Sequence, residues 1–193
     1  MKTFHQKVYL IRHGETEWTA SKQHTGLTDI PLTDEGREQA QWLIKKLKGK
    51  KFKKVLCSPL QRATETCEIA GLLKEAVLDK DLLEWDYGDY EGKTTAEIRE
   101  TDPKWTIFTK GAPNGESIGD IGARTQRLIS RVRDIQGDVA LFSSGHISRA
   151  IGARWLHLPV TEGKLFLLST ASLSILGYER ENPVIVTWNQ TQS

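Results

Sequence analysis

The chain has 193 residues, with 27 basic and 25 acidic side chains and a formal net charge of +2. A chain of this length can bury a core without disulfides and fits one domain, here 1–193. The near balance of charge gives no general attraction to polyanions, so we expect no nucleic-acid partner. Apolar runs reach only about four residues, whereas a membrane-spanning helix needs ~20, so we expect no membrane segment.

The cysteine and histidine residues bear on cellular location and metal binding. Cys57 and Cys67 are the only cysteines, and the five histidines are scattered along the chain. The first residues hold no apolar stretch of signal-peptide length, so we expect reduced thiols and a cytoplasmic protein. The scattered histidines predict no metal site, and we expect no cofactor. A homo-oligomer is left open.

Strand and helix signals alternate along the chain. β-Branched and apolar runs predict strands, and apolar spacing behind capping residues such as Thr33 predicts helices. The predicted strands are 8–11, 54–57, 77–78 and 138–142, with a terminal hairpin of 174–178 and 184–188. The predicted helices are 34–47, 59 to about 73, 95–101, 117 to about 136, and 147 to about 157.

This alternation predicts an α/β fold: a three-layer αβα sandwich around a mostly parallel central sheet with an antiparallel edge. Residues 84–116 differ from the rest, because they are rich in Gly, Asp, Thr and aromatic residues and contain Pro103 and Pro113. We interpret them as an inserted, largely irregular cap segment with one short helix.

Polar clusters follow three of the predicted strands. They are 12–14, 58–62 and 143–146. In open α/β sheets, ligands bind just beyond the carboxyl ends of the strands. The sequence therefore predicts one site at this edge, built from all three clusters.

The residue types in these clusters suit an anionic substrate. A neutral imidazole such as His13 is a competent nucleophile toward phosphorus, and the planar donor fork of Arg12 matches phosphate oxygens. Arg62 falls in the first turn of a predicted helix, where its charge adds to that of the helix N-terminus. Glu84 lies among aromatic residues that could desolvate it into a general acid. Each of these residues also has a simpler interpretation when it is considered alone. His13 could be an ordinary histidine at a strand end, Arg62 a surface arginine, and the segment around Glu84 a polar loop.

Together, three motifs resemble the histidine phosphatase superfamily, which includes the cofactor-dependent phosphoglycerate mutases. They are Arg12-His13-Gly14-Glu15-Thr16, Ser58-Pro59-x-x-Arg62-Ala63-x-x-Thr66 and Glu84-x-x-x-Gly88-x-x-Glu91-Gly92. Residues 25–33, 84–92 and 113–117 are most similar to the branch containing a sedoheptulose-1,7-bisphosphatase. The resemblance spans roughly residues 7–180 and implies a phosphoglycerate mutase-like fold.

The resemblance implies a role for each residue. His13 would become phosphohistidine, Arg12 and Arg62 would hold the phosphoryl oxygens, and Glu84 would protonate the leaving alkoxide and then activate water. Substrate contacts are expected from Thr19, His24, Thr25, Gly26, Ser144 and Gly145. For Thr19, His24 and Thr25, an ordinary loop role is the alternative.

One position departs from the family pattern. The family carries a second catalytic His directly before the glycine after the late strand, and here Ser144 precedes Gly145. His146 follows two residues later. Three interpretations remain: His146 reaches the phosphate from the helix N-terminus, which we favour, Ser144 donates an uncharged hydrogen bond, or activity is reduced. Loss of a charged donor in such a site costs ~10²–10³ in rate.

The sequence thus predicts a metal-independent phosphomonoesterase for a small phosphorylated metabolite, a sugar phosphate or bisphosphate. One alternative is a phosphoglycerate mutase, which we disfavour because few basic residues follow the acid loop. The other is a phosphate-binding protein of low activity, which the replacement at position 144 suggests.

Overall fold

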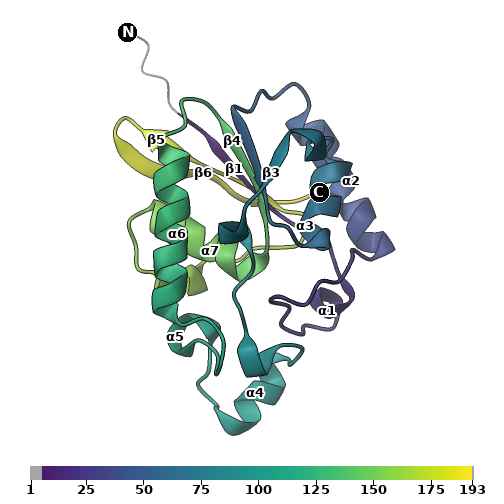
Figure 1. Ribbon diagram of the computed structural model, residues 1–193, viewed down its shortest axis with the longest axis vertical. Helices are drawn as coiled ribbons and strands as arrows, with labels where there is room; N and C mark the ends of the chain where they lie inside the picture. The colour runs from purple at the N-terminus through teal and green to yellow at the C-terminus, as the bar shows by residue number, and fades with distance from the viewer. Residues whose placement is uncertain (1–5, 193) are drawn as a thin grey trace.

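A computed structural model describes residues 6–192 of the chain. Its centre is a six-stranded sheet in the order β3-β2-β4-β1-β5-β6 (Figure 1). The strands are β1 Val8–Arg12, β2 Lys54–Cys57, β3 Ala76–Leu78, β4 Val139–Ser143, β5 Leu173–Glu179 and β6 Asn182–Gln190. The first four are mutually parallel, and the hairpin of β5 and β6 pairs antiparallel to β1. The mostly parallel sheet with an antiparallel edge is confirmed.

Helices cover both faces of the sheet, with α2 and α3 on one side and α6 and α7 on the other (Figure 1). The helices are α1 Glu17–Ala20, α2 Asp34–Leu47, α3 Gln61–Ile69, α4 Thr95–Thr101, α5 Ile107–Lys110, α6 Ile118–Arg133 and α7 Gly145–Trp155. Alternate residues of a strand point to opposite faces. Val8 and Leu10 accordingly join one apolar cluster, and Tyr9 and Ile11 join the other. The predicted three-layer sandwich is therefore confirmed.

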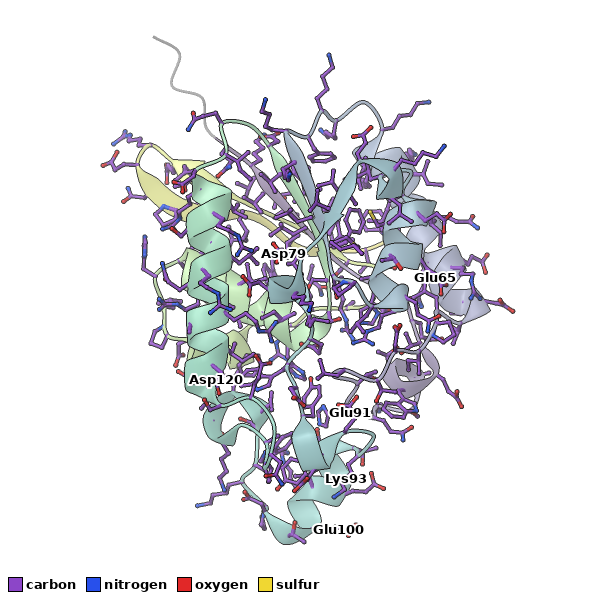
Figure 2. The ribbon with its side chains drawn as sticks, viewed as in Figure 1. Glu65, Asp79, Glu91, Lys93, Glu100 and Asp120 are labelled. Atoms are coloured by element: carbon purple, nitrogen blue, oxygen red, sulfur yellow. The ribbon has the colours of Figure 1, made fainter. Side chains whose placement is uncertain are left out.

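Side chains cap the starts of two long helices, and the cap predicted at Thr33 is one of them. Thr33 accepts a hydrogen bond from Gly36 N at the start of α2. Ser117 and Asp120 form a reciprocal capping box at the start of α6, and Figure 2 shows Asp120 at the lower end of that helix. α6 ends at Arg133, short of the predicted residue 136.

Helix α3 differs more from its prediction. It begins at Gln61 rather than Pro59, because Leu60 is extended and acts as the N-cap. It ends at Ile69 rather than near residue 73, and Gly71 follows with a φ of +79°. That left-handed conformation, which glycine adopts without a steric penalty, stops the helix. α7 starts at Gly145, two residues before the predicted residue 147.

Residues 84–116 project away from the sheet toward the bottom of Figure 1. The single predicted helix is present as α4, and α5 is a second helix that sequence patterning missed. Trp85, Trp105 and Phe108 from this segment are buried in the same cluster as α6 and α7. Among residues 6–192, no helix is both long enough and apolar enough to cross a membrane.

Candidate active site

A cavity of about 90 Å³ opens where β1 and β4 end. Arg12 pairs with Ser143 in the sheet, and His13 N donates to Ser143 O over 3.0 Å. The residues after the two strands therefore lie side by side. The cavity is lined by Arg12, His13, Thr19, Gln23, His24, Thr25, Glu84, Tyr87, Gly145, His146, Arg149 and Leu168.

The His13 ring is buried beside two guanidinium groups. Its Nδ1 lies 2.7 Å from Gly14 O. Because a carbonyl only accepts, Nδ1 carries the proton and the neutral ring leaves Nε2 with a free lone pair. Burial lowers the pKa of His13 well below 6.5, and the charges of Arg62 and Arg12 lower it further. The ring is thus uncharged at neutral pH, and the lone pair of Nε2 is available.

Arg12 and Arg62 each hold a backbone segment and keep one donor unused. Arg12 Nη1 donates to Leu168 O over 2.5 Å, and the Nη atoms of Arg62 donate to Gly26 O and Thr28 O. The Nε atoms of both are buried and have no hydrogen-bond partner among the described residues. Burial lowers the pKa of both arginines, and the nearby Glu84 opposes that effect. Two fixed, incompletely satisfied cations favour an anion at this place.

The loop after α1 is held from two sides. Arg62 binds its carbonyl groups, and the Glu91 carboxylate accepts from Gly26 N at 2.8 and 3.0 Å and from Thr28 N at 3.1 Å. Figure 2 shows Glu91 between this loop and the segment carrying α4. A Cβ atom at Gly26 would lie 2.6 Å from the backbone oxygen of Trp85 and from Glu91 Oε2, so this close approach requires glycine. Thr25 of the loop is thereby fixed against the cavity.

Glu84 reaches the cavity from the start of the 84–116 segment. Its side chain is buried, and its carboxylate accepts from Trp85 N, His146 N and Ile147 N at 2.8–2.9 Å. Two of these amides belong to the first turn of α7, where unpaired N–H groups and the helix dipole favour negative charge. The carboxyl group is therefore locked in one orientation beside Arg12 and His13. These three residues and Gly145 form the part of the cavity that we call the charged half.

A second group of lining residues is neutral. His146 Nδ1 is hydrogen-bonded to the Tyr87 hydroxyl, and His24 packs on the Tyr87 ring with centroids 4.8 Å apart. Burial lowers the pKa of His146 well below 6.5 and that of His24 to about 4. Both imidazoles are thus uncharged at neutral pH and offer only ordinary hydrogen bonds. We call Gln23, His24, Tyr87 and His146 the aromatic half.

Most of the residues singled out in the sequence meet in this cavity. Arg62, Gly26 and Ser144 lie outside its lining. Arg62 and Gly26 bond each other directly behind Thr25. Ser144 is buried at the N-cap of α7, and its Oγ has no hydrogen-bond partner among residues 6–192. Within the same described range, no three His, Cys, Asp or Glu side chains are grouped to hold a metal ion.

Sequence reasoning missed Gln23, Arg149 and Leu168. Tyr87, one of the aromatic residues that follow Glu84 in the sequence, both lines the cavity and is buried in the core. Arg149 stands three residues after His146 in α7, so helical spacing could have placed the two on one face. Its guanidinium donates to Gly163 O and Lys164 O and lies 4.6 Å from the Phe108 ring. Gln23 and Leu168 carry no comparable signal.

Comparisons with known proteins agree with this geometry. The model of the histidine phosphatase superfamily (branch 1) matches residues 8–191. An acid phosphatase of Mycobacterium tuberculosis is 42% identical over 90% of this chain and 87% of its own. The sedoheptulose 1,7-bisphosphatase of Saccharomyces cerevisiae is 33% identical over 83% of this chain and 71% of its own. The solved structure of the M. tuberculosis open reading frame Rv3214 has a TM-score of 0.92 at 38% identity, covering 96% of this chain and 98% of that one.

Proposed function

Since the chain belongs to branch 1 of the histidine phosphatase superfamily and is a phosphoric monoester hydrolase, we propose that it hydrolyses a small sugar phosphate or bisphosphate through phosphohistidine at His13. The observation that carries the proposal is the state of this ring. It is buried, neutral and protonated on Nδ1, and it lies beside two arginines whose Nε donors have no partner among the described residues.

The proposed reaction has two steps. His13 Nε2 attacks phosphorus, the P–O bond to the substrate breaks, and protonated Glu84 gives its proton to the departing oxygen. The Glu84 carboxylate then takes a proton from water as that water attacks the phosphohistidine, which releases phosphate and restores His13. Arg12 and Arg62 neutralise the phosphoryl charge in both transition states, which is the main requirement of phosphoryl transfer. No step needs a metal ion.

The contacts of His146 and Ser144 indicate which of them replaces the family's second catalytic histidine as a hydrogen-bond donor to the phosphoryl group. His146 is held by Tyr87 in the aromatic half, and its lowered pKa leaves it uncharged. Ser144 directly follows Ser143, whose carbonyl binds His13 N, and its buried Oγ is unpartnered among residues 6–192. Of the interpretations that the sequence leaves open, we therefore assign the uncharged phosphoryl donor to Ser144 and a contact with the rest of the substrate to His146.

The substrate class follows from the remaining walls. Neutral imidazole and phenol groups in the aromatic half suit the hydroxyls of a polyol. Arg149 lines the same cavity and forms no ion pair among the described residues, which suits a second anionic group. The printed names of the two curated relatives, an acid phosphatase and a sedoheptulose 1,7-bisphosphatase, fit this class. Residues 84–116 would form a cap that restricts access, in a single domain. A cytoplasmic location and the absence of a nucleic-acid partner remain predictions.

His13→Ala tests the proposal. The variant should lose turnover of p-nitrophenyl phosphate and sugar phosphates and should form no acid-labile phosphoryl adduct in quenched reactions. Wild-type activity should persist in EDTA. Full turnover in the variant would contradict the nucleophile assignment. Isomerisation of 3-phosphoglycerate that depends on a bisphosphate primer would favour a mutase, and phosphate binding without turnover would favour a binding protein.

A further inference from the structure

Arg124, on the inner face of α6, contacts the segment that carries Glu84 without reaching the cavity. Its Nη1 donates to Asp81 O at 3.2 Å and Leu83 O at 2.5 Å, and its Nη2 donates to Glu84 O at 3.2 Å. Its side chain is only 9% exposed. One buried cation thus binds three carbonyl groups within four consecutive residues, ending at Glu84 itself.

Glu116 completes the arrangement from the other end of the cap segment. Its carboxylate receives Arg124 Nε at 2.9 Å and Nη2 at 2.6 Å, and it also accepts from Asp86 N at 3.0 Å. Its backbone N donates to Asp86 O at 3.0 Å, and its carbonyl accepts from Trp85 Nε1 at 2.8 Å. The segment is therefore bound by Arg124 up to Glu84 and by Glu116 directly after it.

We propose that the Arg124–Glu116 pair is the positioning device of the proton donor, fixing the backbone on both sides of Glu84 so that its carboxyl group meets the leaving oxygen. This inference rests on the proposed function of Glu84. A general acid works only within hydrogen-bond reach of the atom that it protonates. The three amides that hold the carboxylate are aligned with it only while its own backbone stays in place.

Two other arginines of α6 supply a contrast. Arg127 and Arg131 form ion pairs with the side chain of Asp81, and Arg131 also pairs with Asp79, which is labelled beside α6 in Figure 2. Both are about half exposed or more, and neither donates to a backbone carbonyl of residues 83–86. They attach the same segment to the same helix, but through a side chain three residues away from Glu84.

The test separates positioning of an acid from a general loss of structure by varying the leaving group. p-Nitrophenolate departs without a proton, whereas a sugar alkoxide needs one. The ratio kcat/KM covers only the first chemical step, so it isolates phosphohistidine formation from the later use of Glu84 with water. Glu116→Gln and Arg124→Lys keep side-chain size and are compared with Arg127→Ala as the matched control.

We expect Glu116→Gln to lower kcat/KM for a sugar phosphate by about 10²-fold, the cost of misplacing a catalytic group by about 1 Å. The value for p-nitrophenyl phosphate should change by less than about threefold, because that ester does not draw on acid catalysis. Arg127→Ala should leave both values near those of the wild type. Equal losses on the two substrates in both Glu116→Gln and Arg124→Lys would overturn the proposal and indicate a purely structural pair.

The Glu84→Gln background gives the decisive readout. If the pair acts through Glu84, adding Glu116→Gln to Glu84→Gln should cause no further selective loss on the sugar phosphate. An additive loss would overturn the inference while leaving the role of Glu84 intact. If Glu84→Gln alone shows no dependence on the leaving group, the proposed function of Glu84 fails, and that outcome is distinct. Far-ultraviolet circular dichroism and thermal unfolding of each variant verify that it is folded.

Discussion

The two halves of the cavity depend to different degrees on the ends of the strands. In the charged half, Arg12 ends β1, His13 follows it, Gly145 begins α7 with one residue between it and β4, and Glu84 alone comes from the irregular 84–116 segment. In the aromatic half, Gln23, His24 and Tyr87 come from irregular segments that a few hydrogen bonds hold in place. A sheet edge fixes reacting groups well, while loops vary without disturbing it.

The two halves offer different chemical groups to a substrate. Charge, a lone pair and a carboxyl group gather beside the ends of β1 and β4, and in the proposed reaction this set acts on the phosphoryl group. Neutral hydrogen-bonding rings form the other half, where we propose that the rest of the substrate binds. If this division between the halves holds, loss of His13 or of an arginine that binds the phosphoryl group should lower activity on every substrate alike. Substitution of the proton donor Glu84 should weigh more on leaving groups that need a proton. Substitutions in the aromatic half should act on sugar phosphates alone.

Removing a cation from behind the charged half should have the largest effect. Arg62→Gln should lower kcat/KM by ~10²–10³ on both p-nitrophenyl phosphate and a sugar phosphate, because a donor to the developing charge is lost. The substitution should also shift the acid limb of the pH–rate profile to higher pH. Burial lowers the pKa of His13 well below 6.5 and the charge of Arg62 lowers it further, so without that charge the ring should become protonated at a higher pH than in the wild type.

Arg62→Lys is the matched control, measured over the same range of pH. It keeps the positive charge, so the acid limb should stay close to that of the wild type. The rate should still fall, because the three donors of an ammonium group share one nitrogen. The guanidinium of Arg62 instead binds Thr28 O and Gly26 O through two separate nitrogens and keeps the Nε donor free. An unchanged limb in Arg62→Gln would show that this arginine does not set the protonation of His13.

Ser144, which precedes Gly145 of the charged half, offers a smaller change. Ser144→Ala removes one neutral donor, which is worth roughly 1–1.5 kcal/mol, so kcat/KM should fall by about tenfold. The loss should be equal on both substrates. Steady-state kinetics of His146→Gln, run in parallel, should show a loss on the sugar phosphate only. The reverse pattern would return the donor role to His146.

The charged half could be foreseen from sequence because sheet topology brings its parts together. The bounds of β2 are those predicted, β1 extends one residue further than predicted, and β4 begins and ends one residue later than predicted. Once three parallel strands are placed, their carboxyl ends must meet at one edge, so Arg12, His13 and the 143–146 cluster had to be neighbours. The spacing of apolar residues and the helix caps are local signals, and they were sufficient to place these strands and the residues that follow them.

The aromatic half could not be foreseen, because it depends on how irregular segments return to the sheet. Gln23 and Leu168 stand in stretches with no helical or strand period, and no local rule predicts that Tyr87 meets His146 across 59 residues. The same holds for the Arg124–Glu116 pair, whose partners are mostly backbone atoms. Because every residue carries the same backbone carbonyl group, a contact with that group cannot be predicted from residue types.

The smallest predicted effect tests the aromatic half directly. Tyr87→Phe keeps the ring that packs against His24 and removes only the hydroxyl bound to His146. One lost hydrogen bond between neutral groups costs about 0.5–1.5 kcal/mol, so KM for a sugar phosphate should rise by roughly two- to tenfold. KM for p-nitrophenyl phosphate should not change, because its flat ring makes no use of an oriented imidazole donor. A rise of equal size on both substrates, measured by initial rates, would mean that the Tyr87–His146 contact supports the phosphoryl site itself, and the division between the halves would fail.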